Sequence, residues 1–374
     1  MHERQRLAGG VHAQCCIHLG VMQKGNGERI VFLDYLRSIA IVCVVIVHAA
    51  ENVYRFNVTE YAAWTLTERI VMVGLFDLGR MSVPLFFFIS GYLLLSRNYD
   101  DEKCCRFWRR NWLPLLTASS FSIFLVSIWD LWGGLGNLVM WKTVAKASMF
   151  VGPVPCGILW FLPVMVGLYG CVPVVAVALE RFRPRTLMSP LGVAMLMTMV
   201  IPMMVPLLRC TVHISLEPAL SIGWVGGCYG IYVIAGGMMG RGLKLPMGAG
   251  GSLALGSVFF LAVMCYTWLG YARGSASNVW YSSPLLFVAS LCVFDAFSKM
   301  PNLRPCRMVR SLAACSFGIY ALHYPILIFF VERLPHNNIL SVLVSIPLTL
   351  LVTWGIVAFL SLYRFLAHWV LLAK

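Results

Sequence analysis

The chain has 374 residues, of which 60% are hydrophobic and only 12% are charged, and its formal net charge is +14. Soluble domains usually carry about 25% charged residues, and a single soluble core of this size could not hide so much apolar surface. The composition therefore excludes an ordinary soluble protein and indicates an all-α polytopic membrane protein whose solvent is the lipid bilayer.

The N-terminal residues lack the pattern of a membrane segment. We expect residues 1–28 to form a cytoplasmic tail and residues 29–374 to form one transmembrane domain. A second methionine, Met22, precedes the polar run next to the first apolar segment. We therefore expect residues 1–21 to be dispensable, either as an over-long gene prediction or as a disordered tail.

Ten later segments have the apolar length of about 20 residues that a helix needs to cross a bilayer. They are residues 30–50, 81–96, 111–131, 157–179, 187–208, 221–240, 247–269, 279–297, 311–331 and 339–363. Residues 62–79 are mixed in character, and we expect them to form a separate interfacial helix before the second span. The sequence thus predicts about ten transmembrane helices.

The charges between the spans support this number. If the N-terminus lies inside, 20 basic residues fall in inside segments and eight in outside segments. Cytoplasmic loops are enriched in Lys and Arg, so we expect both termini to be cytoplasmic. Because no basic run alternates with aromatic residues on a polar surface, we expect no nucleic-acid partner. The 13 cysteines show no CxxC pair and no Cys/His metal spacing, so we expect no metal site.

The first span contains three ionisable residues, Asp34, Arg37 and His48. At 100° per residue the step from Arg37 to His48 returns to the same helix face, about 16 Å further along the axis. Asp34, three residues before Arg37, lies on the same stripe. Ionisable residues inside a membrane usually face a cavity or a partner. The stripe therefore predicts either a functional cavity or an interhelical salt bridge with a structural histidine.

The second span opens with Arg80, which we place at the mouth of the helix, and it contains Ser82 and Ser90. Pro84 and Gly91 in the same run are typical of a kinked structural helix. Arg80 is the residue of this run for which we favour a functional role.

The ninth span carries Ser316, Tyr320 and His323 at positions i, i+4 and i+7, so the three share one face. This face predicts either a polar cavity or hydrogen bonds between helices. Trp160 lies at the start of the fourth span, where an interfacial aromatic anchor is an equally good interpretation.

These residues together resemble the acyltransferase-3 family. Leu33, Asp34, Leu36 and Arg37, followed after ten residues by His48, resemble that family's Arg-x10-His signature. The second signature is similar to Ser82, Phe86, Ser90, Gly91 and Tyr92. Arg109-Arg110, residues 159–162, and Ser316, Tyr320 and His323 follow in similar order. The resemblance covers about residues 22–370, and the run from Arg80 to Phe87 is most similar to the branch that contains the enterobacterial common antigen O-acetyltransferase.

The resemblance implies an acyltransferase-3 fold and an O-acyltransferase of the bacterial inner membrane. Such an enzyme moves an acyl group, usually acetyl, from cytosolic acyl-CoA to a hydroxyl of an envelope glycan or lipid-linked saccharide, with no permanently bound cofactor. His48 is then expected to act as the general base, because an imidazole exchanges protons near neutral pH. Arg37, with Asp34 beside it, is expected to assist at the reaction centre or to attract CoA phosphates.

The remaining residues divide between the two substrates. We expect the donor CoA to be bound by Arg80, Arg109 and Arg110. We expect the acceptor to be bound by Ser82, Ser90, Trp160, Tyr320 and His323. His323 is also the competing candidate for the general base.

Two other functions and one structural question stay open. A secondary transporter or flippase would use the intramembrane Arg and His residues as a proton or anion path. A non-catalytic membrane scaffold would need none of them for turnover. A homo-oligomer is compatible with the sequence.

Overall fold

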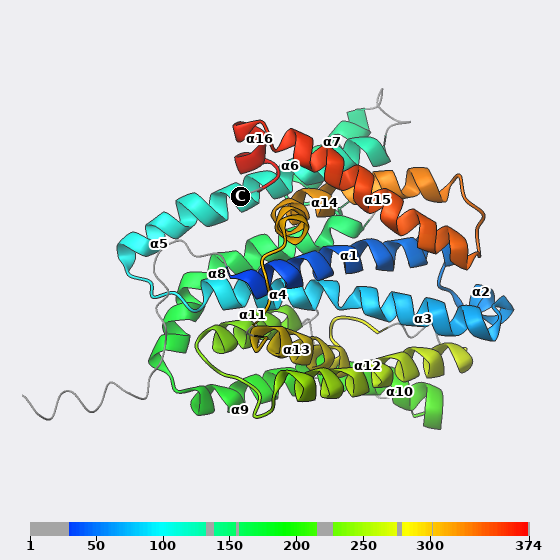
Figure 1. Cartoon of the computed structure of the whole chain (residues 1–374), viewed down its shortest axis with the longest axis horizontal. Coiled ribbons are helices and arrows are strands. Elements are labelled where there is room, and N and C mark those ends of the chain that lie inside the picture. The colour runs from blue at the N-terminus through cyan, green and yellow to red at the C-terminus, as the bar shows by residue number, and fades with distance from the viewer. Residues whose placement is uncertain are drawn as a thin grey trace, which may run out of the picture. The chain divides into compact units, whose positions relative to one another are not determined.

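The computed structural model describes residues 30–131, 138–154, 157–214, 227–274, 279–300 and 302–372, and every regular element in these residues is helical (Figure 1). The predicted tail, residues 1–28, and Met22 within it lie outside the described residues. The α-helices are α1 Val31–Tyr54, α2 Val58–Ala63, α3 Leu66–Arg80, α4 Ser82–Leu94, α5 Asp101–Phe107, α6 Leu113–Asp130, α7 Leu138–Ser148, α8 Phe161–Arg181, α9 Pro184–Met195, α10 Ile201–Val212, α11 Gly227–Gly240, α12 Ala249–Ala272, α13 Pro284–Ser298, α14 Arg307–Val331, α15 Ile339–Leu360 and α16 Arg364–Trp369. Two π-helical turns, η1 Trp108–Trp112 and η4 Leu196–Val200, and the short 3-10 helix η3 Ile158–Trp160 join some of them.

Within the described residues, eight helical segments are long and apolar enough to cross a membrane. They are Val31–Tyr54, Leu66–Leu94, Asp101–Asp130, Ile158–Arg181, Pro184–Arg209, Ala249–Ala272, Arg307–Val331 and Ile339–Leu360. The other two expected spans coincide with shorter helices, namely α13, which has 15 residues, and α11, which follows the undescribed residues 215–226. The prediction of an all-α polytopic membrane protein is therefore confirmed.

The predicted start of the second span is wrong. The apolar segment begins at Leu66 rather than at residue 81, because α3 and α4 follow each other with only Met81 between them. Charged residues dilute the apolar character of α3 in the sequence, but they are buried or bonded in the fold. Asp77, for example, is fully buried and accepts a hydrogen bond of 3.0 Å from Thr267. Arg80 consequently lies in the middle of a long span, not at its mouth.

Helix α1 lies at the centre of the membrane domain, where it packs against α3, α4, α14 and α15 (Figure 1). Its residues Ala40, Ile41, Val45 and Ala49 are fully buried. A helix that is apolar nearly all round is suited to such a buried position. The helix that carries Asp34, Arg37 and His48 is thus surrounded by other helices.

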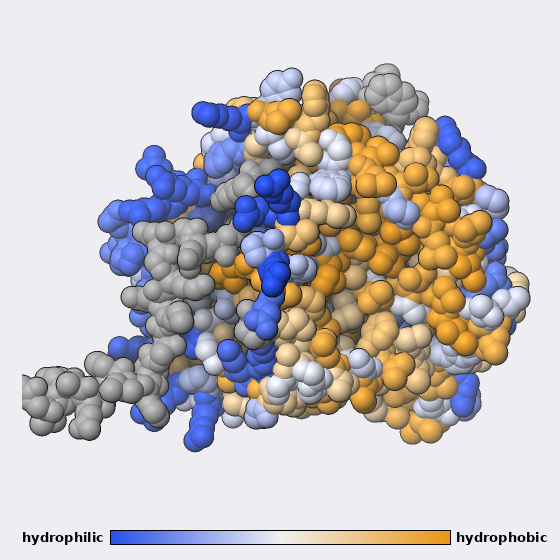
Figure 2. Space-filling view, viewed as in Figure 1, coloured by the Kyte–Doolittle hydropathy of each residue, from blue (hydrophilic) through white to orange (hydrophobic). Residues whose placement is uncertain are grey.

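The two ends of the domain differ in charge. Where α1 begins, Phe32 meets Tyr92 and Phe294, and the Tyr35 hydroxyl donates to Arg304 O at 3.1 Å. This end, which we call the basic end, collects basic residues at helix termini. They are Arg97, Lys103, Arg106, Arg109, Arg110, Arg241, Lys244, Lys299, Arg304, Arg307 and Arg310. Figure 2 shows the hydrophilic side chains gathered there, at the left, beside a broad hydrophobic band.

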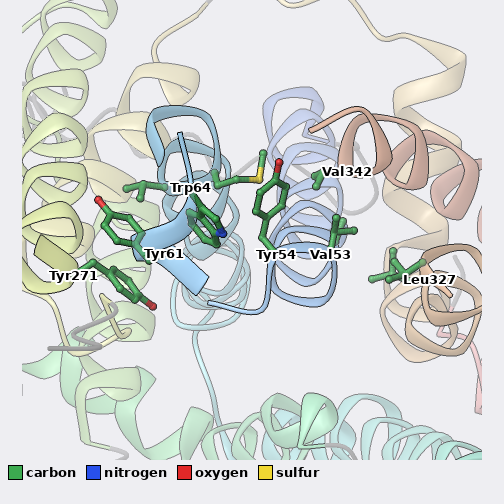
Figure 3. Close-up of a cluster of buried hydrophobic side chains, with 11 residues drawn as sticks. Val53, Tyr54, Tyr61, Trp64, Tyr271, Leu327 and Val342 are labelled. Carbon is green, nitrogen blue, oxygen red and sulfur yellow. The ribbon is translucent and has the colours of Figure 1, made fainter. Parts of the chain in front are cut away.

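The opposite end, where α1 finishes, is held by an aromatic cluster (Figure 3). Trp64 packs edge-on against Tyr54 with 5.0 Å between ring centroids, and Tyr61 stacks on Tyr271 at 4.8 Å. The Tyr54 hydroxyl also donates to Glu68 at 3.0 Å. Because aromatic pairs add packing energy to the burial of their surface, the cluster fixes the last turns of α1, which carry His48. We call this end the site end.

Helices α4 and α11 touch through their backbones. A Cβ atom added at Gly91 would lie 1.9 Å from the carbonyl oxygen of Val233, and one added at Gly236 would lie 2.2 Å from that of Phe88. Small residues permit this close approach in membrane helix pairs. The packing holds α4, and Arg80 just before it, against α11.

Candidate active site

The two histidines that the sequence singled out lie side by side. His48 of α1 and His323 of α14 have ring centroids 5.4 Å apart. They are 275 positions apart in the chain, so only the packing of α14 on α1 brings them together. The His48 side chain is 17% exposed, whereas His323 is completely buried. His48 is therefore the more accessible histidine of the pair.

Glu51, one turn after His48, connects this histidine to Arg80. The Glu51 carboxylate lies 2.9 Å from His48 Nδ1 through one oxygen and 2.9 Å from Arg80 Nη2 through the other. A carboxylate only accepts hydrogen bonds, so His48 donates through Nδ1, and a neutral imidazole then has its lone pair on Nε2. A carboxylate that orients an imidazole in this way is a common feature of histidines that act as bases.

Arg80 is buried among aromatic rings. Its guanidinium carbon lies 4.6 Å from the ring centroid of Phe76, 4.9 Å from that of Trp280 and 5.5 Å from that of Tyr281. Arg80 Nη1 also faces the Tyr281 hydroxyl at 3.4 Å. Ring faces attract a cation, and together with Glu51 they offset part of the cost of burying this charge in a membrane domain.

His323 has one bonded and one unbonded ring nitrogen. Its Nδ1 donates to the carbonyl oxygen of Tyr320 at 2.7 Å, so its Nε2 is an acceptor. Within the described part of the chain, Nε2 is buried without a hydrogen-bond partner. Buried polar atoms normally have a partner. This nitrogen is therefore a buried acceptor that the described residues leave without a hydrogen bond.

Tyr324, Asn52 and Tyr320 make further contacts around the histidine pair. Tyr324 packs edge-on against His48 with 5.9 Å between centroids, and its hydroxyl donates to the side-chain oxygen of Asn52 at 3.2 Å. Asn52 in turn donates to the backbone carbonyl of His48 at 2.7 Å. The Tyr320 hydroxyl donates to Ile158 O at 2.7 Å, which attaches η3 to α14. Trp160, at the end of η3, is thereby brought to the same end of the domain as His48.

The chain was compared with known protein families, with curated proteins and with solved structures. The acyltransferase domain family matches residues 30–358, which is most of the chain. The chain belongs to the acyltransferase-3 family. Neither the curated proteins nor the solved structures gave a match. The chain is accordingly a membrane acyltransferase, and the groups around His48 are its candidate active site.

The residues predicted for the acyltransferase site divide between two levels. His48, Arg80, Trp160, Tyr320 and His323 lie at the level of the histidine pair. Ser82 belongs with them, because it is buried next to Tyr281. Arg37 lies about 16 Å and Asp34 about 21 Å away along α1, toward the basic end. Ser316 lies on the same helix as His323, about two turns nearer that end.

Arg37 and Ser90 belong to the level nearer the basic end of the acyltransferase. Arg37 forms an ion pair with Asp34, with 3.7 Å between nitrogen and oxygen. The Ser90 hydroxyl lies 3.3 Å from that of Tyr169. Tyr169 is close enough to Arg37 for an electrostatic interaction with its guanidinium group. Ser90 therefore lies with the cationic groups rather than with the histidine pair, where its expected role in binding the acceptor would place it.

Arg109 and Arg110 sit on the π-helical turn η1, and both are exposed at the basic end. Nearby Arg106 pairs with Glu102, and Lys103 pairs with Asp100 at 2.8 Å. Lys103 lowers the pKa of the Asp100 carboxyl through hydrogen bonds from its side chain and its backbone. Among the described residues, no acidic group pairs with Arg109 or Arg110. Their charges are thus available to an anionic ligand.

Sequence reasoning missed three residues of this site. Glu51 had a usable signal, because it stands three residues after His48 on the same helix face. Trp280 and Tyr281 had none, since they lie in an irregular segment before α13. In the described residues, no group of three or more His, Cys, Asp or Glu residues is arranged to hold a metal ion.

Proposed function

We propose that this acyltransferase moves an acyl group, most simply acetyl, from cytosolic acyl-CoA to a hydroxyl of an envelope glycan or lipid-linked saccharide. The observation that carries the proposal is the hydrogen bond of 2.9 Å between His48 and Glu51 beside the second imidazole of His323. This arrangement favours a base that removes a proton from a hydroxyl. The acetyl donor is what the resemblance of the Arg80–Phe87 run implied, and it is part of this proposal.

In the proposed reaction, His48 Nε2 takes the proton of the acceptor hydroxyl. At the same time the hydroxyl oxygen bonds to the carbonyl carbon of the thioester. The carbon–sulfur bond then breaks. The CoA sulfur takes the proton from the imidazolium and leaves as a thiol. Glu51 holds the imidazole through Nδ1 and stabilises the imidazolium that forms between the two steps.

Arg80 was expected to bind CoA together with Arg109 and Arg110. It contacts Glu51 and Tyr281 at the level of the histidine pair, whereas Arg109 and Arg110 lie at the basic end. We therefore propose that Arg80 positions Glu51. In this proposal Arg109 and Arg110 bind the CoA phosphates, and Arg37 assists from inside the domain. Guanidinium groups bind phosphate oxygens well.

His323 is assigned to the acceptor. Its Nε2 is an acceptor without a hydrogen-bond partner among the described residues and lies beside His48, so we propose that it receives a second hydroxyl of the same acceptor. Its complete burial makes it the poorer base. Tyr320, Trp160 and Ser82 line the same level and are proposed to help orient the acceptor.

We further propose that the protein lies in the cytoplasmic membrane of a bacterium with the basic end and both termini in the cytoplasm. The support is the collection of Arg and Lys residues at that end. Accessibility labelling of single cysteines at Met1 and Lys374 tests this orientation. Labelling of the two positions from opposite sides would contradict it.

Mass spectrometry of envelope glycans and lipids, with and without the gene, tests the function. We expect the mass of one acetyl group to disappear from a glycan when the gene is deleted and to return with the wild-type gene. The His48→Ala gene should not restore it. Transport of a small molecule without any covalent change would favour a transporter or flippase. Restoration by His48→Ala would favour a scaffold.

A further inference from the structure

Four aromatic side chains gather beside the histidine pair from three separate parts of the chain. Trp160 comes from η3, Tyr229 from α11, and Trp280 and Tyr281 from the segment before α13. The Trp160 ring centroid lies 5.4 Å from that of Tyr229, 6.0 Å from that of Trp280 and 5.3 Å from that of Tyr281. All three of these pairs are inclined by only 34° or 35°. Trp280 meets Tyr281 edge-on at 60°, and Tyr229 and Tyr281 are inclined by 57°. The four rings therefore form a cluster around Trp160, which we call the aromatic platform.

The aromatic platform has a buried part and an accessible part. Tyr229 and Tyr281 are 5% and 3% exposed, whereas Trp280 is 42% exposed and Trp160 is half-buried. The two tyrosines therefore lie deeper in the protein than Trp280 and pack against the tryptophans. The Tyr232 hydroxyl fixes this support by donating to Tyr281 O at 2.8 Å.

The aromatic platform is joined to the proposed base by direct contacts. Arg80 packs on the faces of Trp280 and Tyr281, and it donates to Glu51, which bonds to His48. Each link of this series is a contact between neighbouring side chains. A molecule that stacks on Trp280 is therefore separated from the His48–Glu51 pair only by the side chain of Arg80.

The chemistry of the faces selects the kind of ligand. An aromatic ring has a negative face, which attracts groups with positive edges such as polarised C–H bonds. A pyranose ring offers such C–H bonds on one face and hydroxyls around its rim. Stacking would bury the C–H face and leave the rim hydroxyls free to react. A flexible acyl chain has no flat face to match these rings.

An interfacial anchor is the other interpretation of an exposed tryptophan in a membrane protein. An anchor needs only the lipid headgroups, and it has no need of stacked partners or of a buried arginine behind it. Trp141 on α7 serves as a comparison, because it is also 42% exposed. Trp141 lies on α7, which packs on α6, whereas Trp280 packs on Arg80.

We infer that Trp160 and Trp280, backed by Tyr229 and Tyr281, form the platform on which a sugar ring of the acceptor stacks beside Arg80 and the His48–Glu51 pair. This inference rests on the proposed function and identifies where its saccharide substrate binds. The platform acts on acceptor binding and not on the donor.

The test uses the purified full chain in a detergent without sugar headgroups. The acceptor is the envelope glycan fraction of cells that lack the gene, and the donor is labelled acetyl-CoA. Wild type, Trp280→Ala, Trp280→Phe and the matched control Trp141→Ala are compared. Loss of one stacked ring should raise the KM for glycan about tenfold in Trp280→Ala and less in Trp280→Phe. The KM for acetyl-CoA should not change, and Trp141→Ala should match wild type.

Equal KM values for glycan in wild type and Trp280→Ala would overturn the platform while leaving the proposed function intact. If Trp280→Ala does not fold, Trp280→Phe and Trp160→Phe decide through the same KM values. A wild-type protein that transfers no acetyl group would overturn the proposed function instead. Calorimetric titration with the same glycan fraction then decides the platform, because binding that Trp280→Phe does not weaken would refute it.

Discussion

Replacing Glu51 by Gln removes one negative charge and almost no volume from the site. The carboxylate lies 2.9 Å from both His48 and Arg80, and its side chain is 31% exposed. At an effective dielectric constant of about 20, two unit charges at this separation attract by about 6 kcal/mol. Water at the partly exposed carboxylate and the cost of removing both charges from water offset about half of this. About 3 kcal/mol then remains to stabilise the imidazolium of His48, which corresponds to about a hundredfold change in rate.

We therefore expect kcat for acetyl transfer to fall about a hundredfold in Glu51→Gln, while the KM for acetyl-CoA stays near wild type. Glu51→Asp should recover part of the rate, because it restores the negative charge at a greater distance from His48. Glu180→Gln is the matched control, since Glu180 is exposed on α8. Detergent-solubilised proteins with equal thermal stability are compared by initial rates. A kcat in Glu51→Gln equal to that of Glu180→Gln would refute the positioning role of Glu51.

Four further changes have expected outcomes. His48→Ala should lower kcat by about 10²–10⁴-fold and by more than His323→Ala, measured as initial rates; the reverse order would make His323 the base. Gly91→Ala should unfold at a markedly lower temperature in a thermal melt, because its Cβ would meet backbone at 1.9 Å. Arg37→Gln should weaken acyl-CoA binding by calorimetry, and unchanged affinity would contradict its donor role. Deletion of residues 1–21 should leave expression and turnover intact, and failure to fold would show that the segment is needed.

The membrane class and most spans could be predicted because hydropathy is a local property of the chain. Eight of the ten expected spans coincide with helices long enough to cross a membrane. The predicted second span begins too late, because the four charged residues of α3 lower the hydropathy of that segment. Asp77 and Arg80 are buried, and Glu68 bonds to Tyr54. Charges that the fold pairs or buries cannot be recognised as such from hydropathy alone.

Part of the candidate site was also within reach of the sequence. Asp34, Arg37 and His48 share one continuous helix, α1, and the period of that helix places them on one face. Glu51 was available by the same reasoning, because it lies one turn beyond His48. The contact of Arg80 with Glu51 could not be predicted in this way, since Glu51 is 29 residues away and on another helix.

The family, the all-helical membrane class and the stripe of α1 could all be predicted, because apolar runs, helical periods and ordered motifs lie in neighbouring residues. Three contacts depend on helix packing instead: His48 with His323, Glu51 with both His48 and Arg80, and Trp160 with Trp280. These contacts depend on which helices pack together and at what depth. That choice comes from side-chain fit along whole helices, such as the glycine contacts between α4 and α11, and not from any single segment.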